Sequence, residues 1–475
     1  MSGNVTPLSP RSAAAGQSPE PPVEDRRDAV LVIGAGPAGL AAARALRARD
    51  IPYDHVERHG VGGIWDIDAP GSPMYEAAHF ISSKTTSGFE GYPMPDEFPD
   101  YPNHRQVLSF LRGFADAYDL TDRIETGVTV ADVAKEPTGR WLVTTADGRR
   151  RRYSAVVCCT GAQWFPSMPE LPGEFTGTFV HSNTYRNADD LRGQRVLVIG
   201  GGNSACDIAV DAARTADRVV ISMRRGYWFI PKHVLGRPSD VFAAGGPHLP
   251  MRVQQFLFGR ALTLLHGKPS RWGLQDPDHK LFETHPVLNS NLFLALQHGD
   301  VEPRPGIRAV QGRTVTFTDG RSAEVDTIIA ATGYRHRVPY AQRYFGDEQH
   351  PDLYLTAFSR EHEGLYGIGF TETNSGAYKH FDAFAQMIAS HLQDKRTDPQ
   401  RYAEFQRFLR TDRPDLSGGI RFDASPRHQG YVDADALAAY RAKVGRKFGW
   451  RLQTGTRRAL DRTRPTDRVL TGTAS

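Results

Sequence analysis

The sequence predicts an α/β fold built on two Rossmann-like dinucleotide-binding units. In the first, the apolar strand AVLVI of residues 29–33 leads into Gly34-x-Gly36-x-x-Gly39 and then into an alanine-rich helix. In the second, VLVI of residues 196–199 leads into Gly200-x-Gly202-x-x-Ala205. A buried strand, a glycine-rich turn and a helix in this order hold a pyrophosphate at the helix N-terminus. Two such units in one chain imply two bound dinucleotides.

The first turn is suited to close approach of a phosphate. Gly34 permits the tight turn, Gly36 lets the pyrophosphate reach the backbone, and Gly39 lets helix and strand pack closely. The next strand ends at Glu57, which follows Gly34 by 23 residues, so its carboxylate can accept hydrogen bonds from an adenosine ribose. A glycine-rich turn without a ligand is the alternative interpretation.

Composition indicates a globular protein of two or three domains. The chain has 475 residues, and its 58 basic and 54 acidic side chains are too evenly balanced to favour nucleic acid as a partner. Cys158, Cys159 and Cys206 lack CxxC spacing, which excludes a dithiol redox centre. Residues 1–27 read as a disordered tail without a signal peptide, and no run of 18 apolar residues occurs. We therefore expect a cytoplasmic protein with no membrane partner.

Residues 69–104 are rich in proline, glycine and aromatic side chains, a pattern typical of a functional loop wrapped over a site. A surface excursion is the alternative. An amphipathic helix is expected at 105–118, and a small strand meander at 126–157 leads to Thr160-Gly161.

The second unit differs from the first at its strand end. Residues 218–222 are followed by Met223, Arg224 and Arg225, where the first unit has Glu57. Guanidinium groups suit a ribose 2′-phosphate that a carboxylate would repel, so this unit is predicted to bind NADPH and the first is not. Solvated surface arginines are the alternative.

An aromatic and proline-rich insertion follows at 226–298, and the remaining chain shows a second crossing between domains. Thr332-Gly333-Tyr334 ends a buried strand and repeats the Thr160-Gly161 pattern. Further helices and strands are expected at 253–265, 291–298, 307–310, 314–318, 325–331 and, as the final helix of the core, 381–392.

A third motif lies between the two glycine-rich turns. Phe175-x-Gly177-x-x-x-His181-x-x-x-Tyr185 resembles the FxGxxxHxxx(Y/F) motif of flavin-containing monooxygenases, and GGIW at 62–65 extends the likeness. The Baeyer-Villiger branch of this class carries Trp where Tyr185 stands, which favours the branch that oxygenates nitrogen and sulfur.

The resemblance implies an FAD domain in two parts, 28–165 and 326–450, with an NADPH domain of residues 166–325 inserted into it and a polar tail at 451–475. It implies NADPH- and O₂-dependent oxygenation of a nucleophilic nitrogen or sulfur of a small molecule through a C4a-hydroperoxyflavin. Because the flavin carries the chemistry, no side chain is assigned as nucleophile, and no metal is expected. Alternatives are Baeyer-Villiger oxidation of a ketone, a peroxide-releasing NADPH oxidase and a non-catalytic flavoprotein or redox-sensing module. A homodimer is possible.

The resemblance also implies cofactor-binding residues by position. The residues expected to bind FAD are Gly34, Gly36, Pro37, Ala38, Gly39, Glu57, Gly63 and Trp65. Those expected to bind NADPH are Gly200, Gly202, Asn203, Ser204, Arg224 and Arg225. At the second crossing, Thr332 and Gly333 are expected to contact a cofactor. His181 is either a satisfied histidine beside the interdomain link or a cofactor contact.

One position departs from the family. Members commonly carry Asn three residues before the lysine that corresponds to Lys84, and this chain has Ile81 there. An aliphatic side chain donates no hydrogen bond, so the efficiency of oxygen transfer is in doubt.

Overall fold

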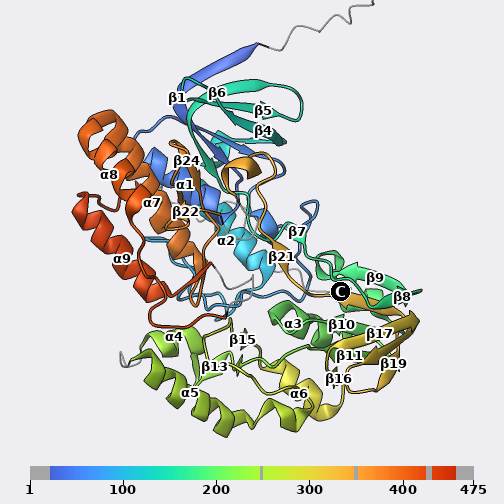
Figure 1. Cartoon of the computed structure of the whole chain (residues 1–475). Coiled ribbons are helices and arrows are strands. Elements are labelled where there is room, and N and C mark those ends of the chain that lie inside the picture. The colour runs from blue at the N-terminus through green and yellow to red at the C-terminus, as the bar shows by residue number, and fades with distance from the viewer. Residues whose placement is uncertain (1–21, 246–249, 347–350, 424–429, 456–475) are drawn as a thin grey trace, which may run out of the picture.

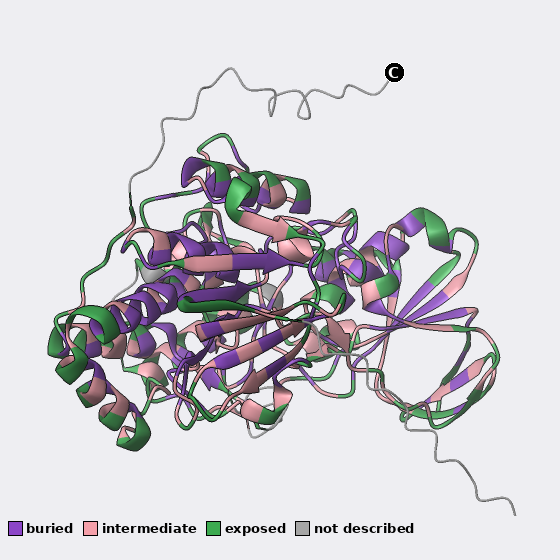
Figure 2. Ribbon diagram, turned by 90° about the horizontal axis from the view of Figure 1, so that it is seen from above, coloured by how far each residue is buried: buried purple, intermediate pink, exposed green. Residues whose placement is uncertain are grey.

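The computed structural model describes residues 22–245, 250–346, 351–423 and 430–455. They form one mixed sheet and one parallel sheet as the two main layers, one above the other in Figure 1, and helices cover both. Viewed from above in Figure 2, buried strands fill the interior, whereas exposed positions gather on the outer helices and turns. The predicted α/β fold is confirmed.

The first sheet is built around the first dinucleotide unit. Its strands run in the order β22-β23-β24-β6-β1-β2-β3, and β4 and β5 extend β6 as the predicted meander. The strands span Leu353–Tyr354 (β22), Phe358–Ser359 (β23), Leu365–Gly367 (β24), Arg150–Cys158 (β6), Val23–Ile33 (β1), Tyr53–Glu57 (β2), Ile124–Thr126 (β3), Val130–Lys135 (β4) and Trp141–Thr145 (β5). Ile33 aligns with both Val56 and Cys158, so the carboxyl ends of β1, β2 and β6 share one edge.

The second sheet repeats this arrangement around the second unit. It is wholly parallel, in the order β16-β11-β10-β20-β9. Its strands span Val301–Arg304 (β16), Arg218–Ser222 (β11), Arg195–Ile199 (β10), Thr327–Ala330 (β20) and Thr178–His181 (β9). A smaller sheet of β8 (Gly173–Phe175), β17 (Ile307–Gly312), β18 (Thr314–Phe317) and β19 (Ser322–Glu324) lies beside it. Ile199 aligns with Ser222 and Ala330, which places three carboxyl ends at one edge again.

The second sheet lies in sequence between two parts of the first, so the expected insertion of one unit into the other is present. Its upper boundary is later than the predicted residue 325, because β20 pairs with β10 and β9 in the second sheet. The chain returns to the first sheet only after Thr332-Gly333. A buried strand alone does not reveal which of two sheets it joins.

The two crossings between the units are bonded to each other. β7 (Phe165–Pro166) follows Thr160-Gly161, β21 (Tyr334–Arg335) follows Gly333, and the two pair antiparallel. Ser167 N–H donates to Gly333 O at 2.9 Å, and Thr332 Oγ1 donates to Ser167 O at 2.6 Å. The units are therefore joined by a short two-stranded ribbon.

Helix α1 (Pro37–Arg47) follows the first glycine-rich turn and packs against two other helices of the first unit. α2 (His104–Ala117) has a capping box between Asn103 and Gln106, and the long α7 (Ala377–Thr397) is tied to α1 by the buried ion pair of Arg44 with Asp382. The prediction of α7 as the final helix is wrong. α8 (Pro399–Thr411) and α9 (Ala434–Lys447) follow it, stacked beside α7 in Figure 1.

Both predicted tails are shorter in the structure than in the prediction. β1 starts at Val23, where Val23 to Arg26 pair with β6, so residues 23–27 belong to the sheet and not to a tail. At the other end, the backbone carbonyl of Arg451 accepts a hydrogen bond from the Arg49 side chain. The backbone of Gln453 exchanges two hydrogen bonds with the side-chain amide of Gln386. Residues 1–21 and 456–475 of the predicted tails lie outside the described residues.

The insertion of the second unit carries its own small elements. α3 (Asn203–Ala212) and α6 (Asn291–His298) cover the second sheet, and α6 has the predicted bounds. The others are β12 (Phe229–Ile230), β13 (His233–Val234), β14 (Arg237–Pro238), α4 (Ser239–Ala244), α5 (Met251–His266) and β15 (Val287–Leu288). Two short strands near the C-terminus, β25 (Glu372–Thr373) and β26 (Tyr431–Val432), pair in parallel.

Candidate functional site

The first glycine-rich turn is packed so tightly that neither Gly34 nor Gly39 has room for a side chain. Gly34 has φ +104°, and a Cβ there would lie 2.5 Å from Cys159 O. A Cβ on Gly39 would lie 1.7 Å from Gly34 O. Glu57 is buried beside this turn, where its Oε2 accepts from Ala35 N–H at 2.6 Å and its Oε1 from His59 N–H at 2.9 Å. The turn and the acidic strand end are thus one hydrogen-bonded unit.

The GGIW segment is attached to the same turn. Gly62 N–H donates to Ala35 O at 3.1 Å, and a Cβ on Gly63 would lie 3.0 Å from Gly36 Cα. Gly63 begins the 3₁₀ turn η1 (Gly63–Trp65), and the Trp65 ring stacks on Phe80 with 5.0 Å between centroids. The structure therefore brings together the predicted FAD residues from three separate segments.

His55 is a member of this site that the sequence did not reveal. Its ring is buried, and Nε2 lies 2.9 Å from Gly34 O, to which it donates. Burial lowers the pKa of His55 to about 4, so the ring is neutral near pH 7. A lone histidine inside a strand gave no signal, because strand periodicity does not show which side chain faces a turn.

The second glycine-rich turn has the same construction. Gly200 has φ +137°, and a Cβ there would lie 2.4 Å from Ala331 O, just before Thr332. Gly202 caps α3, and Asn203 Oδ1 accepts from Leu288 N–H at 2.9 Å. Ser204 is exposed in the first turn of the helix. Each glycine-rich turn therefore packs against the end of a strand, at Cys159 O or Ala331 O, just before the chain crosses to the other unit.

The two arginines after β11 have different surroundings. Arg224 is exposed, whereas Arg225 NH1 is 2.6 Å from Asp423 Oδ2 and its guanidinium lies over the Tyr227 ring. The Tyr227 ring also lies against Gly201, where a Cβ would be 2.1 Å from it. Arg225 is therefore already engaged by a carboxylate, and Arg224 is the arginine open to a ligand phosphate.

The residues of the FxGxxxHxxxY motif are structural in this chain. A Cβ on Gly177 would lie 2.3 Å from Asp326 O and 2.6 Å from the Phe175 ring. His181 Nδ1 accepts from Asn183 N–H at 3.2 Å, so Nε2 carries the proton and donates to Gly333 O at 3.0 Å. Burial lowers the pKa of His181, and both nitrogens have protein partners, which favours the satisfied-histidine interpretation. Through the hydrogen bond from His181 to Gly333 O, the motif links β9 of the second sheet to the ribbon.

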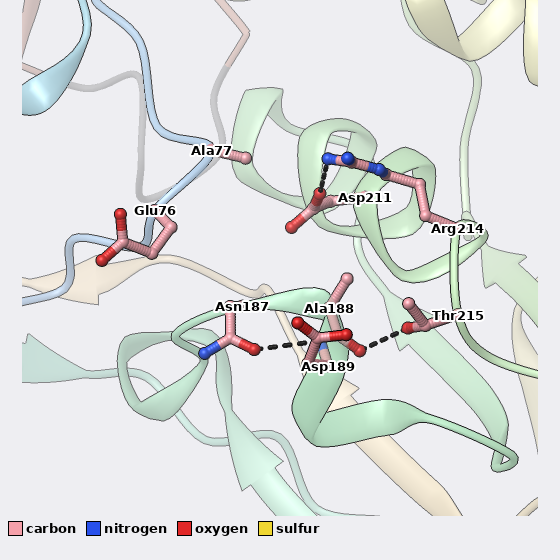
Figure 3. A pocket seen from close by; sticks show the side chains of 8 residues that line it. All are labelled: Glu76, Ala77, Asn187, Ala188, Asp189, Asp211, Arg214 and Thr215. Atoms are coloured by element: carbon pink, nitrogen blue, oxygen red, sulfur yellow. Dashed lines mark hydrogen bonds and ion pairs between the residues drawn. The ribbon is translucent and has the colours of Figure 1, made fainter. Parts of the chain in front are cut away.

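Tyr185, the last residue of the motif, anchors the segment to α3. Its hydroxyl donates to Asp211 Oδ2 at 2.7 Å, and Asp211 also pairs with Arg214. Figure 3 shows Asp211 and Arg214 at one wall of a polar cavity of about 260 Å³. The other lining residues come from the 69–104 loop, from the segment after Tyr185 and from the turn after α3: Glu76 and Ala77; Asn187, Ala188 and Asp189; and Thr215.

The 69–104 loop contacts both units. Tyr75 is buried in the core of the second unit, and its hydroxyl lies 3.3 Å from Asp207 Oδ2. Asn289 Nδ2 donates to the other oxygen of Asp207 at 2.6 Å, and burial raises the pKa of this carboxyl. Asp207 was missed in the sequence, although an acidic residue among the apolar residues of α3 marks an inward-facing polar group.

Ile81 lies farther along the same loop. It is 42% exposed, and the backbone next to it is held by the insertion, since Asp240 Oδ2 accepts from Ser83 N–H at 2.7 Å and from Thr86 Oγ1 at 2.6 Å. Lys84 Nζ donates to Asp96 O and Phe98 O. The loop is thus fixed from both units, and the Ile81 side chain contributes no hydrogen bond to it.

The three cysteines are buried, and burial raises the pKa of Cys158 to about 12 and those of Cys159 and Cys206 well above their usual value. They are thiols of the core, as their apolar surroundings in the sequence indicated.

The fold and the paired glycine-rich turns define a class of two-dinucleotide flavoproteins, and sequence comparison identifies the family. The chain matches the profile described as FMO-like, flavin-binding monooxygenase-like, over residues 27–369. It belongs to this family, and it is an FAD-dependent NADPH monooxygenase by class.

Two relatives are identical to this chain at about three in ten aligned positions. Flavin-containing monooxygenase 5 of Oryctolagus cuniculus is 31% identical over 344 residues, which are 66% of this chain and 63% of that protein. Probable indole-3-pyruvate monooxygenase YUCCA9 of Arabidopsis thaliana is 29% identical over 358 residues, 72% of this chain and 84% of the relative.

Among solved structures, S-allyl-L-cysteine S-oxygenase from Allium sativum has a TM-score of 0.62 at 21% identity and covers 89% of both chains. A steroid monooxygenase bound to NADP has a TM-score of 0.67 at 17% identity, over 88% of this chain and 97% of that one. These likenesses show the shared fold.

The residues present fit both cofactors. Each carboxylate oxygen of Glu57 accepts one backbone hydrogen bond and retains capacity to accept from a ribose hydroxyl. Gly36 and Gly63 face each other across the turn, and Gly63, with φ +59° and a Cβ that would lie 3.0 Å from Gly36 Cα, has no room for a side chain, so backbone lines this part of the cradle. In the second unit, the exposed Arg224 follows the strand end beside the Gly200 turn. The sites therefore suit a dinucleotide without and one with a 2′-phosphate.

Proposed function

We propose that this protein oxygenates a nucleophilic nitrogen or sulfur atom of a small molecule, with NADPH as reductant and O₂ as oxidant. The observation that carries the proposal is the equivalence of the two turns. Gly34 packs against Cys159 just before the first crossing, and Gly200 packs against Ala331 just before the second. The two crossings pair with each other as one two-stranded ribbon. Two dinucleotides held at these turns would meet on either side of that ribbon.

When bound, FAD supplies the acceptor for hydride from NADPH and the centre that activates O₂. The chain's own residues position it. Gly34, Gly36 and Gly39 would admit the pyrophosphate. Glu57 would accept hydrogen bonds from the ribose, and the hydrogen bonds from Ala35 N–H and His59 N–H fix the orientation of its carboxylate. His55 fixes the carbonyl of Gly34 and, being neutral, adds no charge beside the phosphates.

A water-poor surface adjoins this cradle. Trp65, Phe80 and Tyr378 form consecutive ring contacts of 5.0 and 5.4 Å between centroids, and Phe80 and Tyr378 are buried. Apolar rings next to a reacting centre exclude water and so limit loss of reactive oxygen species to solvent. On the NADPH side, Gly200, Gly202, Asn203, Ser204 and Arg224 would hold the second dinucleotide.

Two observations support nitrogen or sulfur as the atom oxygenated. The motif ends in Tyr185 and not in the tryptophan of the Baeyer-Villiger branch. The relatives include a dimethylaniline monooxygenase described as N-oxide-forming, from Oryctolagus cuniculus and 30% identical over 338 residues.

A peroxide-releasing NADPH oxidase is the second candidate, and Ile81 is the observation that favours it. Its aliphatic side chain supplies no hydrogen-bond donor where the family commonly has an amide, and Ser82 beside it is already bonded to Ser87. In that case most electrons from NADPH would reach solvent as hydrogen peroxide.

The test is product analysis by mass spectrometry with ¹⁸O₂, using the flavin-containing full chain and a panel of tertiary amines, thioethers and ketones. We expect one ¹⁸O atom in an N-oxide or sulfoxide and none when the label is in H₂¹⁸O. Labelled esters from ketones alone would assign the Baeyer-Villiger reaction. NADPH consumption that yields only peroxide would assign the oxidase, and no consumption under air would leave a non-catalytic flavoprotein.

A further inference from the structure

Helix α5 of the insertion exposes large apolar side chains to solvent, which is unusual for a surface helix of a globular protein. Five of its apolar side chains are exposed to solvent: Val253, Phe256, Leu257, Leu264 and Leu265 are 41%, 60%, 50%, 88% and 66% exposed. These five residues, called here the α5 face, recur at helical spacing and so lie along one side of the helix. Surface helices normally present polar residues to water, which makes a run of this kind a mark of an interaction site.

The orientation of α5 is fixed by its opposite side. Gln255 is buried, and its Nε2 donates to Leu281 O at 2.9 Å. Gly259 lies against the Trp228 ring, where a Cβ would be 3.4 Å from the ring edge. A polar glutamine is thus held inside while Phe256 and Leu264 are held outside. In Figure 1, α5 lies at the lower outer margin of the molecule, away from the first sheet.

The charged residues of α5 and of the turn that follows it all have one sign. From Met251 to Gln275 there is no acidic residue, whereas Arg252, Arg260, Lys268 and Arg271 are all exposed. The guanidinium of Arg260 lies over the Phe256 ring at 5.5 Å, so a positive group accompanies the apolar one. Basic residues beside an exposed apolar stripe are the combination found in helices that lie in the headgroup region of anionic membranes.

We propose that the α5 face binds the surface of an anionic lipid bilayer, with the helix parallel to the membrane plane. The described helices include none long and apolar enough to cross a membrane. The expectation of no membrane partner was based on the lack of a spanning run, and a helix lying in the interface needs no such run.

A second copy of the chain is the competing occupant, and two properties of the face disfavour it. Symmetric contact would bring the same basic residues of both copies together. The helix has 16 residues and is therefore about 24 Å long, so one such face covers far less than the ~800 Å² per partner of a stable interface.

The experiment is co-sedimentation of the flavin-containing full chain with two kinds of vesicle, pure phosphatidylcholine and phosphatidylcholine with one third phosphatidylglycerol. We expect binding to the anionic vesicles only, reduced at least tenfold by 1 M salt, since the Debye length there is about 3 Å. F256S/L264S should bind at least tenfold more weakly, and R252Q/R260Q should lose the preference for anionic lipid.

The matched control is L294S, because Leu294 on α6 is 52% exposed but lies outside the α5 face. It should bind vesicles like the parent. Equal flavin content and melting temperature in all variants would show that folding is intact, as expected for substitutions of exposed residues. Absence of binding to anionic vesicles, or undiminished binding of F256S/L264S, overturns the proposal. So does a parent dimer that F256S/L264S converts to monomers, which would assign the face to a second copy.

Discussion

Replacement of Gly39 by alanine tests the geometry of the first turn directly. The added Cβ would lie 1.7 Å from Gly34 O, and bringing this contact to 3.0 Å requires α1 and the turn to separate by about 1.3 Å. Backbone cannot yield as a flexible side chain does, so the cost should reach the upper end of overpacking, about 3 kcal/mol. The same movement disturbs the bond from His55 to Gly34 O.

For a domain of this size, 3 kcal/mol corresponds to a fall in Tm of roughly 6 to 12 °C. The expected result for Gly39→Ala is such a fall in thermal unfolding, together with loss of most bound flavin, measured by the ratio of absorbance at 450 and 280 nm. The control is Ala205→Gly at the equivalent position of the second turn, which already accommodates a Cβ. It should cost only about 1 kcal/mol and leave the flavin in place. A Gly39→Ala protein with full flavin and an unchanged Tm would refute the reasoning.

Three further predictions concern the two cofactor sites and their stability. Arg224→Ala should lower kcat/KM for NADPH by roughly ten- to a hundredfold, since a charge-assisted contact contributes about 1.5 to 3 kcal/mol, and leave NADH unchanged. Arg225→Ala should have the smaller effect because Asp423 already engages Arg225; equal losses with both coenzymes would make Arg224 structural. Ile81→Asn should reduce the share of NADPH electrons recovered as hydrogen peroxide in a peroxidase-coupled assay, and an unchanged share would show that Ile81 has no part in oxygen transfer. Because the pKa of His55 is about 4 in the folded protein and near 6.5 when unfolded, the unfolded chain binds the extra proton between these values. His55 therefore lowers the free energy of unfolding by up to about 3 kcal/mol as pH falls from 6.5 to 4, and urea titrations should show a weaker pH dependence in His55→Gln.

The parts of the fold that follow from local pattern were predictable. The Gly34 and Gly200 turns, Glu57 at its strand end and the helix at 291–298 depend on glycine spacing and apolar periodicity, which neighbouring residues determine. The same holds for the three buried cysteines in apolar runs.

Other features depend on which distant segments meet. The partner of β20, the bond from His55 to Gly34 O and the engagement of Arg225 by Asp423 join residues far apart in sequence. The strand at residues 23–27 is polar and exposed, so its composition resembled a tail, and only pairing with the arginines of β6 orders it. Such pairings are properties of tertiary packing and leave no periodic signal.

The placement of β24 beside β6 has a consequence for how the chain folds. About 200 residues separate the two strands, and the whole second unit is made between them. During synthesis, residues 156–158 of β6 therefore emerge without the strand that completes their edge, because β5 pairs only with residues 150–153 and β24 arrives after the second unit has left the ribosome. Closing so long a loop is entropically costly unless the intervening segment is already compact. The second unit should thus fold first and act as the spacer that delivers β24, while the open edge of β6 is the point at which premature aggregation would begin.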